Sequence, residues 1–437
     1  MRVTTERLDV LVAQYLKQSD IDDISKKIFQ AALTHWAQNP GTKPPLITRK
    51  RIDDFLSFLS EQEGKAVKKL EIEAPFQPPS NPEFKFIDLF AGIGGFRMAL
   101  QDLGGKCVFS SDWDKEAQRT YQRNFGETPY GDIRLFTDPD NDDEFIRQNI
   151  PDHDILCGGF PCQPFSRAGV SARNALGKMH GFLDENQGNL FFDIVRIVEV
   201  KRPKVLFLEN VKNLKSHDGG NTFAVIKKTI EDLGYSFNPM VINANTVVPQ
   251  GRQRCYMVCF RNGYEFKFPD FSGEPKKLKS ILEQEVDDKY TISDRLWAGH
   301  QNRTKRNLER GVGFTAFVAN VDKPANTLVA RYYKDGKECL IPQEGKNPRK
   351  LTERECARLM GFPDTYIVSD KRSSAYKQFG NSLVMPVVKR IASSIIPELK
   401  NIQEEEANAG RETIRGIQDS GRAEDMGEGL LVPAYSD

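Results

Sequence analysis

The sequence lacks the features that mark a membrane protein, a disulfide-rich protein or a zinc protein. No stretch approaches the roughly 18 unbroken apolar residues of a membrane span, and the first residues, MRVTTERLDV, have no apolar core like that of a signal peptide. Seven cysteines form no C-x-x-C pair, and no histidine spacing accompanies them. We therefore expect a cytoplasmic protein with reduced thiols, no membrane contact and no metal site.

Net charge is almost absent as well, because 62 Lys and Arg oppose 61 Asp and Glu. The balance hides a segregation: residues 276–350 carry a basic surplus, and residues 401–437 carry an acidic one. The basic segment could face a polyanion, although a solvated surface is the more common explanation for so small a surplus. The acidic segment has few large apolar residues, so we expect it to be disordered.

Residues 1–75 carry apolar residues at helical spacing, as in Leu8, Leu11, Val12 and Tyr15. The proline-rich stretch APFQPPSNP follows and is typical of a linker. The pattern predicts a helical N-terminal extension that ends near residue 80.

Short apolar runs then alternate with helical patterns. The runs are FKFIDLF, KCVFSSD, HDILCGG, KVLFLEN and RCYMVCF, and the stretches between them are long enough for crossover helices. This alternation predicts parallel strands in an α/β layer. The rhythm is lost between about residues 269 and 350, which suggests a smaller inserted domain.

A glycine-rich turn joins the first run to a helix, in FKFIDLFAGIGGFRMAL. Such a turn brings backbone N–H groups close to a polar ligand. Its glycines are Gly92, Gly94 and Gly95, but Arg97 stands where the third glycine of G-x-G-x-x-G belongs, which disfavours a pyrophosphate dinucleotide. Taken alone, the turn is more often a tight connection than a cofactor site.

Acidic residues follow near the same expected sheet edge. Asp112 lies about 20 residues beyond the turn, where a carboxylate can hold ribose hydroxyls. Trp113 could lie against an adenine ring, although an aromatic there is usually packing. Asp132, in GDI, is a further candidate, although an aspartate in an ordinary turn is the competing interpretation. Because these features fall at the ends of successive strands, we expect a nucleoside cofactor without pyrophosphate, with S-adenosylmethionine the obvious candidate.

A thiol follows the third run, in DHDILCGGFPCQPFSRAGV, where Cys162 stands between Pro161 and Gln163. A thiol at the start of a loop can act as a nucleophile, whereas a thiol in an apolar run is usually an inert small hydrophobe. The five histidines show no context that marks a base. The fourth run instead ends in LENVKNL, which places Glu209 at the same edge; burial would favour its protonated form, and a helix cap is its competing role.

Two arginines, Arg252 and Arg254, precede the last run in PQGRQRCYMVCF. Arg254 could steady a carbonyl oxygen of a substrate. A salt bridge between Arg254 and Glu209 is the competing role.

Together these motifs resemble those of the bacterial DNA (cytosine-5) methyltransferases. DLFAGIGGF, GFPCQPFS, ENV, QGRQR, RECARLMGFP and QFGNS stand in the family's order and spacing across roughly residues 84–398. The segments MHGF, VKNLKSHD and RYYKDGKECLI look most like the Dcm-like branch, whose members methylate a cytosine in CC(A/T)GG or CCNGG. Departures are few: Asp112 replaces a more frequent Glu, and Gly251 stands where a larger residue is common.

The resemblance implies an α/β fold, with the Rossmann-like sheet of S-adenosylmethionine-dependent methyltransferases, a smaller target-recognition domain and the N-terminal helical extension. We expect the extension at 1–80 and the catalytic domain at 84–266, completed by 371–400. The target-recognition domain would occupy 267–370, and the disordered acidic tail 401–437.

The resemblance also implies the chemistry and its residues. Cys162 attacks carbon-6 of a cytosine flipped out of duplex DNA, Glu209 engages N3 and the amino group, and Arg254 holds O2, with Arg252 in the same catalytic group. The implied cofactor residues are Phe90, Gly92, Gly94, Asp112, Trp113, Asp132, Ile133, Pro161 and Asn381. The implied DNA contacts are Gln163, Ser166, Thr327, Leu328, Arg331 and Lys334.

Expected partners are double-stranded DNA and a cognate restriction endonuclease system, with the protein itself a monomer. Two alternatives stay open. The first is an RNA (cytosine-5) methyltransferase, because some tRNA-directed relatives share the cysteine loop; RYYKDGKECLI argues against it. The second is a DNA-binding regulator that uses the N-terminal helices as a helix-turn-helix module, although no clear turn glycine in a helix pair supports it.

Overall fold

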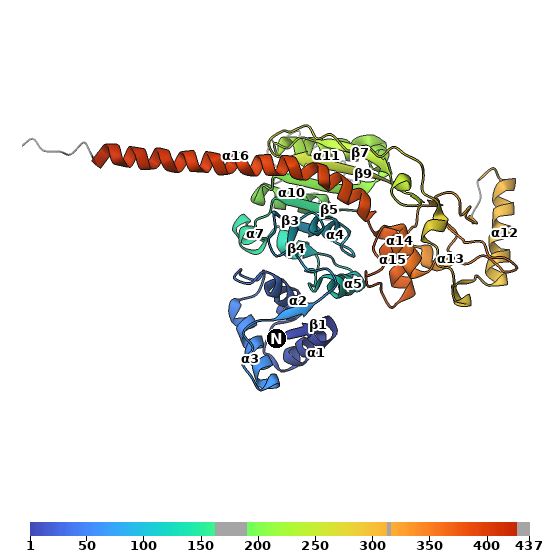
Figure 1. The fold of residues 1–437 in the computed structure, drawn as a ribbon, viewed down its shortest axis with the longest axis horizontal. Helices are drawn as coiled ribbons and strands as arrows, with labels where there is room; N and C mark the ends of the chain where they lie inside the picture. The colour runs from blue at the N-terminus through green and yellow to red at the C-terminus, as the bar shows by residue number, and fades with distance from the viewer. Residues whose placement is uncertain (162–189, 313–315, 426–437) are drawn as a thin grey trace, which may run out of the picture.

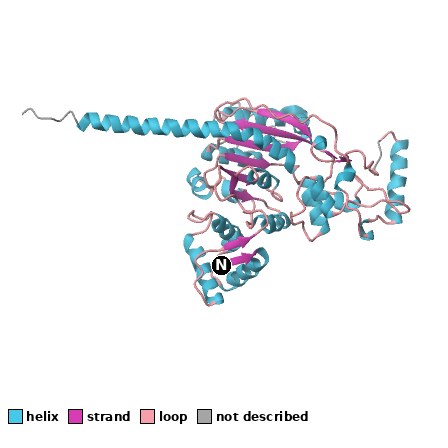
Figure 2. Cartoon of the chain, viewed as in Figure 1, coloured by secondary structure: helices cyan, strands magenta, loops and turns pink. Residues whose placement is uncertain are grey.

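The computed structural model describes residues 1–161, 190–312 and 316–425, with side chains described up to residue 409. At its centre lies a six-stranded sheet, drawn in magenta in Figure 2, with the strand order β4-β3-β5-β6-β9-β7. The strands are β3 (Phe84–Leu89), β4 (Gly105–Ser111), β5 (Ile155–Gly159), β6 (Val205–Val211), β7 (Asn238–Asn243) and β9 (Gln253–Phe260).

Four of the five expected strands are parallel, but the fifth is not. Strands β4, β3, β5 and β6 pair in parallel, whereas β9 is antiparallel to both β6 and β7. The expectation of an all-parallel set was therefore wrong for RCYMVCF. Only a short segment separates β7 from β9, and a parallel pair would need a crossover of a dozen residues or more.

Both faces of the sheet are covered by helices. Successive side chains of a strand point to opposite faces, so neighbouring residues of one strand pack against different helices. Phe86 of β3 belongs to the cluster packed by α4 (Gly95–Gln101), α5 (Lys115–Phe125) and α16 (Met385–Asp425). Ile87 belongs to the opposite cluster, packed by α6 (Arg134–Thr137), α7 (Asp143–Asn149), α10 (Leu190–Lys201) and α11 (Asn221–Asp232). The mixed α/β architecture is thus the expected one.

The N-terminal part is mainly helical, as expected, and it also holds a small sheet. Its helices are α1 (Thr5–Gln18), α2 (Asp23–Gln38) and α3 (Arg49–Glu63), seen in blue in Figure 1. Strands β1 (Arg2–Thr4) and β2 (Glu71–Glu73) pair in parallel across them. Three-residue strands are too short to show a hydrophobic period, so the sequence pattern gave no sign of them.

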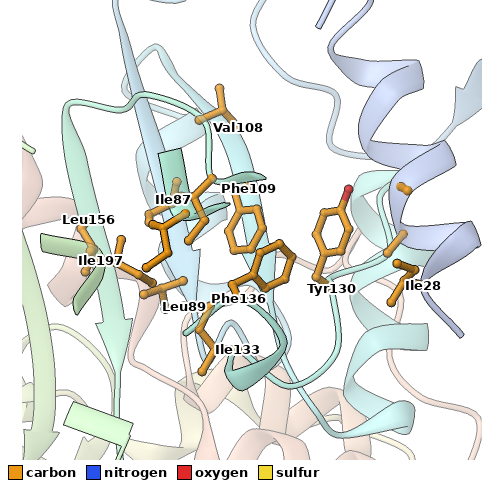
Figure 3. Close-up of a cluster of buried hydrophobic side chains, with 14 of the residues drawn as sticks. Ile28, Ile87, Leu89, Val108, Phe109, Tyr130, Ile133, Phe136, Leu156 and Ile197 are labelled. Atoms are coloured by element: carbon orange, nitrogen blue, oxygen red, sulfur yellow. The ribbon is translucent and has the colours of Figure 1, made fainter. Parts of the chain in front are cut away.

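This N-terminal part shares a hydrophobic cluster with the central sheet. Figure 3 shows Ile28 of α2 in one cluster with Tyr130, Phe109 and Ile87. The rings of Phe109 and Tyr130 stack with centroids 5.2 Å apart. A polar contact adds to this packing, because the Thr128 N–H donates to Thr34 Oγ1 at 2.9 Å. The N-terminal helices are therefore packed onto the part of the chain that holds the central sheet.

Residues 267–370 contain short elements joined by long loops. They include η3 (Leu278–Ile281), η4 (Asp288–Tyr290), α12 (Asp294–Glu309), β10 (Ala325–Asn326), α13 (Tyr332–Asp335) and α14 (Glu353–Leu359), followed by α15 (Arg372–Asn381). Strand β10 joins this segment to the preceding part of the chain, because it pairs with β8 (Gln250–Gly251). Within the segment, the buried Arg349 guanidinium makes two bonds to Glu355, of 2.7 and 2.8 Å.

The expectation of a disordered tail was wrong for residues 401–425, which continue α16 to Asp425. Figure 1 shows this helix, in red, running along the sheet and then out beyond the body of the molecule. The segment is rich in Ala, Glu, Gln and Arg, which have high helix propensity even where packing is absent. Among the described residues, no helix is long and apolar enough to span a membrane.

Gly380 allows a close approach that a larger residue would prevent. A Cβ at this position in α15 would lie 2.3 Å from the backbone N of Ala330 and 2.3 Å from the carbonyl carbon of Val329. We expect Gly380→Ala to lower the free energy of unfolding by about 1–3 kcal/mol, because backbone must move to admit the methyl group. Urea denaturation measures this change.

Gly299, in the exposed helix α12, provides the matched control, because a Cβ there meets nothing within 4 Å. Gly299→Ala should stabilise the protein by roughly 0.5–1 kcal/mol. Equal effects of the two substitutions would contradict the close approach at Gly380.

Candidate active site

A cavity of about 610 Å³ opens at the carboxyl edge of the four parallel strands. It is lined by residues that follow β3, β4 and β5, by the end of β6, and by the end of α15. Most of the predicted site residues therefore meet in one place, as the parallel topology requires. Those that line it are Phe90, Gly92, Asp112, Trp113, Asp132, Ile133, Pro161, Glu209, Arg252, Arg254 and Asn381.

The glycine turn presents backbone to this cavity. Phe90 and Gly92 both have left-handed conformations, with φ of 57° and 56°, and such a conformation in an aromatic residue marks a strained site. A Cβ at Gly92 would meet no atom within 4 Å, so the turn is open on its cavity side. The Gly92 N–H donates to Asp112 Oδ2 at 2.8 Å, which ties the turn to the end of β4.

The prediction for Gly94 needs correction, since Gly94 is not among the residues that line the cavity. Its φ is +81°, and a Cβ would lie 2.2 Å from the ring of Phe125. Gly94 is therefore a packing glycine that lets the turn lie on α5.

Asp112 has the geometry to bind a diol. Its Oδ1 accepts the Asp114 N–H at 2.8 Å and its Oδ2 accepts that of Gly92, so each oxygen keeps one further lone pair. Burial raises the pKa of Asp112 to about 6, while the two N–H groups act in the opposite direction. A ribose whose two hydroxyl groups donate hydrogen bonds to Asp112 would satisfy the remaining lone pairs.

Trp113 is 78% exposed although it lines the cavity, so ordinary packing does not explain this ring. Asp132 is paired with Arg134, whose Nε donates to both carboxylate oxygens at 3.0 Å, and this pairing lowers the pKa of Asp132. An exposed indole, a buried diol acceptor and an open backbone turn suit a nucleoside. The residues present therefore fit S-adenosylmethionine.

Glu209 and Arg254 form an ion pair at the other end of the cavity. Arg254 Nε lies 3.0 Å from Glu209 Oε1, and Glu209 is 9% exposed. Burial raises the pKa of Glu209, and the charges of Arg254 and Arg252 oppose that shift. The competing role suggested for Arg254, a salt bridge to Glu209, is thus the one seen. The second carboxylate oxygen, Glu209 Oε2, lies near Gly159: a Cβ added to Gly159 would be 3.4 Å from it.

The assignment of Arg252 to the catalytic group stays a prediction, and the structure shows what holds this side chain. Arg252 is 2% exposed, and its guanidinium donates to three backbone carbonyls, those of Leu328 (2.8 Å), Gly380 (3.0 Å) and Ser382 (2.7 Å). These bonds join the segment after β10 to the end of α15. Arg252 thus braces the cavity wall that it lines, while its Nε has no hydrogen-bond partner among the described residues.

Asn210, the middle residue of the ENV motif, has a structural role that the sequence pattern did not predict. The Asn210 side chain is buried, and Nδ2 donates to the Phe160 carbonyl at 2.9 Å. It thereby fixes the backbone just before Pro161. An asparagine directly after the predicted glutamate was the available signal.

Cys162, Gln163 and Ser166 lie outside the described residues. Pro161, which directly precedes Cys162 in the sequence, is described and lines the cavity. The other six cysteines are all buried; three of them, Cys157, Cys255 and Cys259, lie in the apolar runs, where an inert core role was expected. No group of three potential metal ligands occurs in the described ranges.

Two of the predicted DNA contacts have structural partners. Leu328 is fully buried and its N–H donates to Gln250 Oε1, so its side chain is not placed to contact DNA, and that prediction is corrected. Thr327 Oγ1 donates to the Gly251 carbonyl at 2.6 Å. Arg331 and Lys334 are exposed.

Comparison with known proteins identifies relatives over most of the chain. A family model described as C-5 cytosine-specific DNA methylase matches residues 84–397. The type II methyltransferase M1.ScrFI of Lactococcus lactis subsp. cremoris is 46% identical over 361 residues, covering 81% of this chain and 88% of that protein. The DNA-cytosine methyltransferase of Escherichia coli strain K12 is 40% identical over 408 residues, covering 81% and 86%.

Solved structures share the fold. A crystal structure of S. pombe Dnmt2 methyltransferase has a TM-score of 0.55 at 19% identity, covering 72% of this chain and 99% of that one. A putative DNA modification methyltransferase encoded within an E. coli prophage has a TM-score of 0.52 at 21% identity, covering 73% and 100%. The fold class inferred from the motifs is therefore confirmed.

The raised pKa of Asp112 predicts a pH-dependent affinity for S-adenosylmethionine. The carboxylate accepts hydrogen bonds from the ribose, so its protonation as the pH falls through about 6 should weaken binding. At pH 7.5 we expect Asp112→Asn to raise the Kd roughly tenfold to hundredfold and to flatten the pH profile. Titration calorimetry between pH 5 and 8 measures both.

The matched control is Asp112→Glu, which keeps the carboxylate and should keep the acid-side weakening. An Asp112→Asn variant that loses affinity below pH 6 as steeply as the wild type would show that another group titrates.

Proposed function

The chain belongs to the C-5 cytosine-specific DNA methylases, and on that premise we propose that Cys162, Glu209 and Arg254 act on a cytosine within CC(A/T)GG or CCNGG. Its activity is that of a DNA (cytosine-5)-methyltransferase that uses S-adenosylmethionine. The observation that carries the residue assignment is one cavity that joins Asp112 and the open turn at Gly92 to the buried pair of Glu209 and Arg254.

The cysteine answers a chemical difficulty. Carbon-5 of cytosine is a poor nucleophile, so a bond must first form between the Cys162 sulfur and carbon-6, and a thiolate both adds and leaves readily. Bound S-adenosylmethionine supplies an electrophilic methyl group to carbon-5. Loss of the carbon-5 proton then lets the sulfur–carbon bond break and returns the thiolate.

Glu209 stabilises the negative charge that develops on the ring during this addition. Electron density moves toward N3 of the ring as the thiolate adds, and a protonated carboxyl beside N3 can supply a proton there. The burial that raises the pKa of Glu209 favours that protonated form. Arg254, at 3.0 Å, holds the carboxyl in place and offers its remaining N–H groups to the pyrimidine O2.

We assign the parts of the chain accordingly. Residues 84–266, completed by 371–400, carry the chemistry, and residues 267–370 read the DNA. Arg331 and Lys334, both exposed, can reach phosphates or base edges, and Thr327 orients the backbone between them and β8. The names of the type II relatives support a role beside a restriction system, and we propose that the protein acts as a monomer.

The RNA-directed alternative has less support. The relatives that are 40–46% identical include proteins named as type II methyltransferases and as a DNA-cytosine methyltransferase. The likeness to S. pombe Dnmt2, at 19% identity, concerns the fold alone.

The nucleophile assignment predicts covalent capture. In the presence of S-adenosylmethionine, duplex DNA with 5-fluorocytosine at the target is methylated at carbon-5 but then has no carbon-5 proton to lose, so the Cys162 adduct cannot resolve. We expect a complex that survives denaturing electrophoresis with the wild type and none with Cys162→Ser; methyl transfer to normal DNA should vanish in Cys162→Ala.

Cys255→Ala is the control, since that thiol is buried in β9 and capture should persist. Equal capture by Cys162→Ser would assign the nucleophile to another residue.

The target assignment predicts a specific methylation pattern. In a bacterial host without cytosine methylation of its own, expression of the chain should protect one cytosine in each CC(A/T)GG or CCNGG site from bisulfite conversion. Conversion at all such sites, together with methyl transfer to bulk duplex DNA in vitro, would reject the target while leaving the activity intact.

A further inference from the structure

The last residue of α2 connects the N-terminal part to three elements of the catalytic part. Gln38 Oε1 accepts a hydrogen bond from Arg97 Nη2 of α4 at 2.7 Å. Its Nε2 donates to the backbone carbonyl of Phe125, the last residue of α5. Its own carbonyl accepts from Lys106 Nζ of β4 at 2.9 Å. Gln38 therefore binds α4, α5 and β4 at once.

Arg97 is fully buried, so each of its N–H groups needs a partner. Nη1 lies 3.2 Å from Oε2 of the equally buried Glu127 and 3.2 Å from the Tyr121 hydroxyl. Nε donates to Gln101 at 2.7 Å. Gln38 supplies the acceptor for Nη2, and removing this acceptor would leave a buried charged donor unsatisfied.

The Arg97 cluster lies directly behind the cofactor turn. Arg97 belongs to the first turn of α4, which begins at Gly95, and Gly94 lies against the ring of Phe125. The position of α4 thus determines where the open backbone at Gly92 stands.

The same cluster also supports the ribose-binding carboxylate. Glu127 Oε1 accepts a hydrogen bond from Ser110 Oγ at 2.9 Å, and Ser110 precedes Asp112 by two residues at the end of β4. Arg97 and Glu127 therefore hold the two halves of the cofactor site relative to each other.

We propose that Gln38 is a positioning residue of the S-adenosylmethionine site, through which the N-terminal helices hold the glycine turn and Asp112 at their binding separation. The proposal rests on the use of this cofactor by the chain, and it gives the N-terminal part a role in cofactor binding. Linkage makes the effect reciprocal: cofactor binding stabilises the docked position of α2 by the same free energy.

The test uses the full chain and equilibrium binding without DNA. Gln38→Met keeps the length and packing of the side chain but removes the acceptor and the donor. We expect the Kd for S-adenosylmethionine, measured by titration calorimetry, to rise roughly threefold to thirtyfold. The kcat at saturating cofactor and the KM for DNA should stay within about twofold, because Cys162 and Glu209 are not touched.

Two further variants separate positioning from simple destabilisation. Gln38→Glu retains an acceptor for Arg97 and should restore part of the affinity. Gln14→Ala, at an exposed position of α1, should leave the Kd unchanged. Hydrogen exchange of the α2 amides should slow when the cofactor binds the wild type, and should not slow in Gln38→Met.

An unchanged Kd in folded Gln38→Met, or an equal rise in Gln14→Ala, would overturn the proposal. If Gln38→Met does not fold, Gln38→Glu decides: its affinity must lie below that of the wild type, and cofactor binding must still slow exchange in α2. These results are independent of the covalent capture that tests Cys162, so either hypothesis can fail alone.

Discussion

Parallel pairing of β3, β4, β5 and β6 is the constraint on which the site depends. Their backbone registers bring all four carboxyl ends to one edge, so residues from distant parts of the chain face a common cavity. A one-residue slip would turn every side chain of a strand to the other face of the sheet. The hydrophobic clusters on both faces, which fix that register, are thus part of what assembles the chemistry.

Burial, as well as the choice of residue, determines the protonation of the acidic groups in this cavity. Glu209 and Asp112 are both carboxyls in a sheltered site, and burial raises the pKa of each. Their neighbours differ: Asp112 accepts two backbone N–H bonds, whereas Glu209 faces the guanidinium of Arg254. The surroundings of Asp112 suit a carboxylate that accepts hydrogen bonds from hydroxyl groups. The surroundings of Glu209 suit the proposed exchange of a proton with a ring nitrogen.

Much of this could be predicted from the sequence, because motifs at the ends of apolar runs must share an edge in a parallel sheet. Gly92, Asp112 and Glu209 were predicted in this way and do line one cavity. Roles that depend on tertiary partners could not be predicted. Arg252 and Arg254 look alike in QGRQR, and only the structure shows that Arg252 donates to three backbone carbonyls whereas Arg254 pairs with Glu209.

The same limit explains the other corrections. Leu328 is held by Gln250 and Gly94 lies against Phe125, and a motif match alone does not separate a packing role from a ligand contact. The antiparallel direction of β9 follows from the short connection to β7, whose weak pattern concealed a strand. Helix α16 extends past residue 401 on propensity, which composition-based reasoning about disorder undervalued.

The brace made by Arg252 has a consequence for redesign of sequence preference. It fastens the segment that we propose to read DNA at the Leu328 carbonyl, and β10 fastens it again at β8. A transplanted reading module with its downstream junction before Ala325 would leave both fastenings in the host protein. A junction placed beyond Leu328 would make the donor module supply the matching carbonyl itself, so a module that exchanges the proposed contacts Arg331 and Lys334 must also fit this brace.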